Sequence, residues 1–124
     1  MIKIALIRGN SLNQYELQSY KYLFHKFKFT GICSLNNLFE IETDQRIELI
    51  RLFSIYDLDI FIPEKFKLKK IFRYIINHEL FYQKMFGLEK VLKNFDIIHS
   101  ADIEYYYTYQ AAKARLKYNS RLVI

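Results

Sequence analysis

Short apolar runs alternate with longer amphipathic segments along most of the chain, and a polar, irregular segment, predicted to be a loop, separates the second run from the third. The runs are rich in β-branched residues, as strands are, whereas the segments between them repeat their apolar positions every three or four residues, as helices do. The first run is apolar throughout, which favours a strand buried on both faces, and the third alternates, which favours a place nearer the edge of a sheet. The predicted strands are residues 2–7, 29–34, 47–53, 97–98 and 121–124.

The segments that separate these strands predict helices. The first should begin at Ser11 or Asn13, because each has a glutamine or glutamate three residues later and can close a capping box. The predicted helices cover residues 11–27, 68–80, 88–94 and 103–117. Their spacing also predicts which side chains face the core. The expected inner positions are Leu17, Tyr20, Phe24 and Phe27 in the first helix and Tyr105, Tyr109, Ala112 and Leu116 in the last.

The alternation of strands and helices predicts the fold. Strands joined through a helix lie parallel, because the helix carries the chain back over the sheet in a right-handed crossover. We therefore predict an α/β fold, a three-layer Rossmann-like domain with a mainly parallel sheet in strand order 3-2-1-4-5. With 124 residues, the chain is expected to form a single domain, residues 1–124.

Composition and charge narrow the classes of protein. Hydrophobic residues make up 52% and charged residues 26%, so the chain is expected to fold, and no apolar run is long enough to span a membrane. The single cysteine, Cys33, cannot form an internal disulfide and is expected to be buried in a cytosolic protein. The net charge of +6 indicates an anionic partner, which could be nucleic acid, a phosphate group or a lipid surface.

The first candidate site follows the first strand, at Arg8, Gly9 and Asn10. A glycine there lets the backbone approach a ligand, and the amide groups at the start of the next helix can bind an anion. Alternatively, Gly9 is a turn glycine without a ligand. The chain lacks a G-x-G-x-x-G pattern, and its histidines and cysteine lack metal-ligand spacing, so we expect no cofactor and no metal ion.

The second candidate site lies at the end of the fourth strand, where His99 precedes Ser100, Asp102 and Glu104. In open α/β sheets the carboxyl ends of strands line the ligand crevice. A histidine in this place can hydrogen-bond a hydroxyl or phosphate group near neutral pH. The predicted strand order makes the fourth strand a neighbour of the first, which would bring His99 and Gly9 side by side. Alternatively, Asp102 or Ser100 caps the following helix.

A third feature is the basic segment 64–73, in which cations alternate with apolar side chains. A basic amphipathic helix of this kind can lie on an anionic membrane, where each cation near the surface adds about 1 kcal/mol. The alternative is a helix that packs on the core and keeps a solvated basic face. Nucleic acid is not an expected partner. The candidate membrane contacts are Lys65, Lys67, Lys69, Lys70 and Arg73.

Three blocks of the sequence share a pattern with a known enzyme class: KIALIRGNSLNQYELQSY, GLEKVLKNFDIIHSAD, and YYYTYQAAKARLKY leading into RLVI. Together they resemble the amino-terminal domain of family 4 glycosyltransferases, which have the GT-B fold. The blocks flank a middle part, residues 36–86, in which the resemblance is weaker. The opening loop also lacks the double glycine that many members have.

The resemblance implies two Rossmann-like domains that face each other across a cleft. The amino-terminal domain holds the acceptor, and the carboxyl-terminal domain holds the nucleotide-sugar donor. Such enzymes transfer a sugar with retention of configuration, usually without a bound metal. By this resemblance His99 is catalytic, Arg8, Gly9 and Asn10 contribute to substrate binding beside the donor sugar and its phosphates, and Asp102 or Glu104 lies near the acceptor.

The function expected from the sequence is therefore that of the acceptor-side domain of a retaining GT-B glycosyltransferase. The donor domain is expected to be absent from this chain, so that the domain is inactive alone. Its expected partners are a nucleotide-sugar donor, which needs the second domain, and a sugar or lipid-linked acceptor at the inner, cytoplasmic face of a membrane. The alternative is a non-catalytic α/β binding or assembly module that forms a homodimer through the edge left by the last strand.

Overall fold

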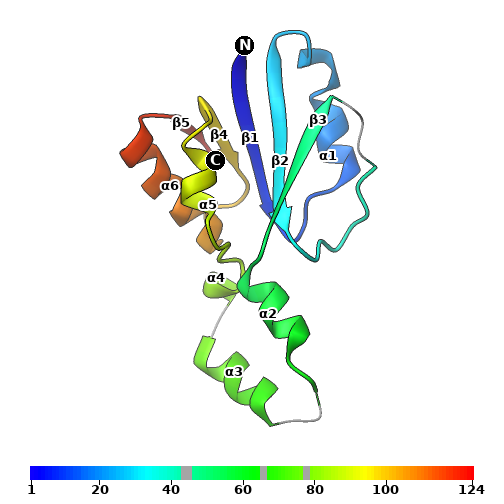
Figure 1. Ribbon diagram of the computed structural model, residues 1–124, viewed down its shortest axis with the longest axis vertical. Helices are drawn as coiled ribbons and strands as arrows, with labels where there is room; N and C mark the ends of the chain where they lie inside the picture. Colours follow the sequence, from blue (N-terminus) through cyan, green and yellow to red (C-terminus); the bar gives the residue numbers. More distant parts are fainter. Residues whose placement is uncertain (43–45, 65–66, 77–78) are drawn as a thin grey trace.

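The computed structural model describes residues 1–42, 46–64, 67–76 and 79–124 (Figure 1). It contains a five-stranded sheet of order β3-β2-β1-β4-β5 in which each pair of neighbouring strands is parallel. The predicted α/β fold and strand order are confirmed, and β3 lies at an edge as expected. The strands are β1 (Ile2–Gly9), β2 (Phe27–Ser34), β3 (Ile47–Leu52), β4 (Ile97–Ser100) and β5 (Arg121–Val123).

Helices cover both faces of this sheet. One face carries α1 (Gln14–Ser19) and the 3-10 turn η1 (Lys21–Leu23), and the other carries α5 (Leu88–Leu92) and α6 (Tyr106–Tyr118) (Figure 1). The side chains of β1 alternate between the two cores, because successive side chains of a strand point to opposite faces. Ala5 and Ile7 pack in the core beneath α5 and α6, and Ile4 and Leu6 pack with Leu17 of α1.

A glycine in the middle of β2 allows close packing over that strand. A Cβ atom at Gly31 would lie 2.8 Å from the side chains of both Leu12 and Leu49. This glycine lets the two leucines close over the backbone of the strand. Cys33, in the same strand, is buried as predicted, and burial raises the pKa of its thiol.

The first helix is shorter than predicted. Asn13, one of the two predicted caps, is the N-cap of α1, but the helix ends well before residue 27, and β2 already begins at Phe27. Tyr20 and Phe24 keep their predicted direction toward the core, since both rings pack on Phe29 of β2. The tighter turn of η1 places these rings over the strand in fewer residues than a continued α-helix would use.

The last helix buries a different face from the predicted one. Tyr109 and Leu116 are 54% and 79% exposed, so their predicted inner positions are wrong. The buried side of α6 carries Tyr107, Ala111 and Ala114, at spacings of four and three residues. The two alanines allow α6 to lie close to the sheet and to α5, which the larger side chains would prevent.

Three helices between β3 and α5 stand beyond the carboxyl edge of the sheet in Figure 1: α2 (Ile55–Phe61), α3 (Leu68–Ile76) and α4 (Glu79–Tyr82). The sequence pattern missed α2, which opens with a capping box formed by Ser54 and Asp57. The helix predicted over 68–80 is divided into α3 and α4, and residues 77–78 lie outside the described residues. We refer to α2 and α3 together as the arm.

Candidate functional site

The carboxyl ends of β1 and β4 lie side by side, as predicted for Gly9 and His99. The two strands are parallel neighbours, in which Leu6 pairs with His99 and Ile7 pairs with Ser100. Gly9 is the last residue of β1. β4 extends to Ser100, two residues beyond the predicted strand 97–98, so His99 lies within the strand near its carboxyl end.

Gly9 and His99 nevertheless contact side chains on opposite faces of the sheet. His99 lies on the α1 face, where it contacts Tyr20. Gly9 adopts a φ of +54°, and a Cβ atom there would overlap Oε1 of Gln83 and lie 2.8 Å from Cε1 of Tyr107, on the α6 face. Both the backbone conformation and the packing at position 9 therefore require a glycine, which supports the interpretation of a turn glycine.

Four polar side chains form a cluster between the strand ends and α1, which we call the histidine cluster: His99, Tyr20, Arg8 and Glu16. The Tyr20 hydroxyl lies 2.9 Å from His99 Nδ1. Arg8 Nε donates to Glu16 Oε2 at 3.0 Å, and its Nη1 donates to the Ile7 carbonyl at 3.0 Å. The cluster therefore joins the ends of β1 and β4 to the helix that covers them.

The protonation of the cluster follows from its burial. Burial lowers the pKa of His99, and the charge of Arg8 lowers it further, while Glu16 acts in the opposite direction. Burial also raises the pKa of Tyr20, so the tyrosine keeps its proton, and in the imidazole tautomer protonated at Nε2 its hydroxyl donates a hydrogen bond to Nδ1. Nε2 then carries the ring proton and can donate a hydrogen bond to a hydroxyl or phosphate oxygen.

We expect the free energy of unfolding to fall as the pH drops below about 6.5, the ordinary pKa of histidine. Because the pKa of His99 is lowered in the folded state, the unfolded chain binds the proton more readily. The corresponding stabilisation is complete above that pH and is lost below it. Urea unfolding of the wild type and of His99→Gln, compared between about pH 5 and 8, checks this.

The His99→Gln variant should lose this part of the pH dependence. Replacement of the exposed His25 by glutamine provides the control and should leave the pH dependence in place. A pH dependence that is the same in the wild type and in His99→Gln would contradict the prediction.

Asn10 forms two hydrogen bonds with Gln83. Its backbone NH donates to Gln83 Oε1 at 3.1 Å, and Gln83 Nε2 donates back to Asn10 Oδ1 at 2.8 Å. Both residues are buried. Gln83 thus holds the turn after β1, and the sequence pattern missed it because the two residues are 73 positions apart.

The polar residues at the end of β4 and in its connection to α6 differ in burial. Ser100 is buried, with its hydroxyl 2.7 Å from the Thr108 hydroxyl, whereas Asp102 and Glu104 are exposed. The expectation that Asp102 or Ser100 caps the helix is wrong, because the N-cap is Tyr105, which makes no side-chain cap bond. Thr108 ties the helix to the connection instead, through the carbonyl of Asp102 at 2.8 Å.

In the basic segment, Arg73 has a structural partner. Its Nε and Nη2 donate to the two carboxylate oxygens of Asp59 at 3.2 and 3.1 Å, and the Tyr82 hydroxyl donates to the same carboxylate at 3.0 Å. Asp59 is buried, so this pair holds α3 against α2. The Arg73 side chain nevertheless remains 60% exposed, so its predicted membrane contact stays a prediction.

The lysines of the segment differ in their surroundings. Lys69 lies mostly covered beside Glu64, while Lys67 and Lys70 are exposed, and Lys65 lies outside the described residues. The alternative expectation of a helix packed on the core is wrong, because no residue of α3 is buried. Among the helices in the described parts of the chain, none has the length and apolarity needed to cross a membrane.

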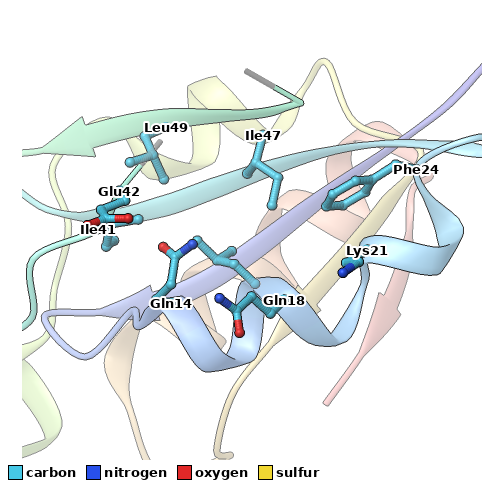
Figure 2. Close-up of a pocket in the computed structure, with 9 residues that line it drawn as sticks. Gln14, Gln18, Lys21, Phe24, Ile41, Glu42, Ile47 and Leu49 are labelled. Atoms are coloured by element: carbon cyan, nitrogen blue, oxygen red, sulfur yellow. The ribbon is translucent and has the colours of Figure 1, made fainter. Parts of the chain in front are cut away.

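A small pocket lies on the α1 face beside β3, separated from β4 by β2 and β1 (Figure 2). Its volume of about 40 Å³ holds only a few water molecules, whereas ligand pockets usually exceed about 300 Å³. It is therefore not the candidate site. Its lining residues are Gln14, Leu17, Gln18, Lys21, Phe24, Ile41, Glu42, Ile47 and Leu49.

The described residues contain no group of three or more His, Cys, Asp or Glu side chains that could hold a metal ion. The chain matches no family model, and no match is found among curated proteins or solved structures. The functional inference therefore depends on the chemistry at the ends of β1 and β4. What the sheet topology shows is an α/β domain with a Rossmann-like fold.

Proposed function

We propose that the chain is the acceptor-side domain of a retaining GT-B glycosyltransferase. The observation that supports this most directly is the placement of Gly9 and His99 at the carboxyl ends of neighbouring parallel strands. Ligands of open α/β sheets bind at such ends. Two of the three blocks that resemble family 4 glycosyltransferases contain these residues.

His99 is the proposed catalytic residue. Its Nε2–H would bind a hydroxyl group of the donor sugar or an oxygen of its phosphates, and the charge of Arg8 nearby would stabilise the negative charge on the leaving group. In the transfer, the bond from the anomeric carbon to the phosphate oxygen breaks and the acceptor oxygen bonds to the same face of that carbon. The proton of the acceptor hydroxyl passes to the leaving phosphate oxygen, which releases the nucleoside diphosphate.

The other predicted substrate-binding residues have supporting roles in this proposal. Gly9 and Asn10 form the turn that brings backbone toward the sugar phosphate, and Gln83 holds that turn in place. The exposed Asp102 and Glu104 border the side on which the acceptor binds. Nucleotide recognition belongs to a second domain, so the domain alone is proposed to be inactive. The proposal also locates the protein in the cytoplasm, at the inner face of a membrane.

Titration of the chain with a UDP-sugar or a GDP-sugar, followed by NMR of isotope-labelled protein, tests the proposal. We expect binding only in the millimolar range, because the nucleotide-binding domain is not involved, with shifts concentrated at the His99 ring and the Gly9 amide. His99→Ala should remove these shifts, and the exposed His25→Ala should preserve them. Tight binding would contradict the proposal that a second domain binds the nucleotide. Shifts confined to other parts of the chain would contradict a binding site at His99 and Gly9.

A further inference from the structure

Helix α3 exposes its apolar side. Leu68, Ile71 and Ile75 are 58%, 52% and 75% exposed, and their spacing of three and four residues places them on one side of the helix. No residue of this nine-residue helix is buried. An amphipathic helix of a globular domain usually turns its apolar side to the core and its charged side to water. In α3 the apolar residues Leu68, Ile71 and Ile75 are exposed instead.

Two of the charged side chains of α3, Lys69 and Arg73, form ion pairs with the preceding segment. Arg73 forms its paired hydrogen bonds with Asp59, whose side chain is only 3% exposed. Lys69 Nζ lies 3.7 Å from Glu64, and the lysine side chain is mostly covered. These ion pairs determine how α3 is rotated about its axis, because a bidentate arginine–carboxylate pair with a buried partner restricts the geometry. Leu68, Ile71 and Ile75 are left largely exposed.

The position of the arm keeps that side uncovered. In Figure 1, α3 is the element farthest from the sheet along the long axis of the molecule. Between α3 and the body lies an open hollow of about 260 Å³, which Ile75 lines together with Ile55, Ile76, Phe81 and Lys84. Ile75 therefore borders this hollow and is not packed in the hydrophobic core.

The charge around this surface indicates what it binds. Lys67 and Lys70 are exposed at the amino-terminal half of α3, and residues 67–76 contain no acidic side chain. A dimer through α3 alone is disfavoured, because a helix about 14 Å long offers far less than the roughly 1,200 Å² that a stable protein interface buries. A flat anionic surface that also accepts apolar side chains matches both features, and the surface of a bilayer with acidic lipids has these properties.

We propose that α3 lies in the surface of an anionic lipid bilayer. Leu68, Ile71 and Ile75 enter the boundary between head groups and acyl chains, and Lys67 and Lys70 contact the acidic head groups. Lys69 stays paired with Glu64 and Arg73 with Asp59 of α2, although the sequence pattern included both among the contacts. The proposal depends only on the arm and does not depend on sugar transfer.

The absence of tryptophan from the chain allows a direct test. The variant Ile75→Trp introduces a single tryptophan, whose fluorescence emission should shift to shorter wavelength when vesicles of phosphatidylcholine with phosphatidylglycerol are added. Vesicles of phosphatidylcholine alone should cause a much smaller shift. The matched control is Leu116→Trp, at a similarly exposed position on α6, which should show no shift. An unshifted Ile75→Trp spectrum, or an equal shift at both positions, would overturn the proposal.

Vesicle co-sedimentation separates the apolar and ionic contributions. Ile71→Ser with Ile75→Ser should weaken binding at least tenfold, whereas Leu116→Ser should leave it unchanged. Lys67→Gln with Lys70→Gln should weaken binding about 30-fold, since each surface cation contributes about 1 kcal/mol. The exposed pair Lys26→Gln with Lys93→Gln serves as the control for net charge and should have a much smaller effect.

Two outcomes of this experiment would overturn the proposal. One is binding that responds equally to both lysine pairs, which would show attraction by net charge alone. The other is the absence of vesicle binding together with a dimer that Ile71→Ser with Ile75→Ser dissociates, which would identify a second copy as the occupant. Neither outcome bears on sugar transfer, because no donor or acceptor is present.

Discussion

Asp57→Ala is expected to lower the free energy of unfolding by about 3–5 kcal/mol, because several hydrogen-bond donors lose their acceptor at roughly 1–3 kcal/mol for each buried one. Asp57 is fully buried. Its carboxylate accepts hydrogen bonds from the backbone NH groups of Ser54, Leu35 and Asn36, and also from the Ser54 hydroxyl and the Asn36 side-chain amide. One side chain thus joins the end of β2, the end of β3 and the start of α2.

The size of the effect follows from the donors that alanine leaves without an acceptor. Each buried donor that loses its partner costs roughly 1–3 kcal/mol, and water can replace the carboxylate only where the loop is exposed. Small domains have a total stability of about 5–15 kcal/mol, so the variant should be close to unfolding. Urea denaturation followed by circular dichroism measures the change.

Two further variants make the Asp57 test specific. Asp57→Asn keeps the shape and one acceptor oxygen and should lose less stability than the alanine variant. The exposed Asp96, which accepts a hydrogen bond from the Lys3 backbone, provides the matched control as Asp96→Ala. A loss for Asp57→Ala of only about 1 kcal/mol, the net value of one hydrogen bond, would show that the carboxylate does not hold these three elements together.

The second large effect is on catalysis. In a protein that joins this domain to a donor-binding domain, His99→Ala is expected to reduce kcat/KM of sugar transfer by roughly 10²–10³-fold, as removal of one preorganised hydrogen-bond donor does. The reason is the proposed tautomer of the neutral ring, in which the Tyr20 hydroxyl donates to Nδ1 and Nε2–H is left as the donor to the substrate. Steady-state transfer assays measure the change, and circular dichroism establishes that the fold is kept.

Variants around His99 distinguish a catalytic role from a structural one. His99→Gln should recover part of the activity if its side-chain amide can reach the position of Nε2–H. Tyr20→Phe should reduce activity less than His99→Ala, because it removes only the group that orients the ring. The exposed His25→Ala should have no effect. If His99→Ala changes only solubility or association, the chain is better explained as an assembly module.

The strand order was predictable because it depends on burial patterns that a strand carries in its own residues. The apolar run of β1 marks a strand that is covered on both faces, and the alternation in 47–53 marks an edge strand. Parallel crossovers then restrict the arrangements that remain. The same reasoning correctly placed Gly9 and His99 at neighbouring strand ends, since both follow directly from strand order and chain direction.

The rotation of the helices was not predictable in the same way. In α6 the pattern favoured large side chains as the inner face, but Ser100 and Thr108 anchor the start of the helix, and Ala111 and Ala114 pack inside. In α3 the ion pair of Arg73 with Asp59, fourteen residues earlier in the chain, determines how the helix contacts α2. Local periodicity reveals that a helix has two sides, but it does not reveal which side finds a partner.

The sequence by itself determined the fold class, the strand order, the buried Cys33 and the edge of the sheet at which the candidate residues meet. Only the tertiary structure decided that His99 and Gly9 serve opposite faces, that Gln83 holds the turn at Asn10, and that α3 exposes its apolar side. The physical reason is the range of the interactions. Burial periodicity is written into consecutive residues, whereas hydrogen bonds and ion pairs join residues far apart in the chain and depend on how the packed elements finally meet.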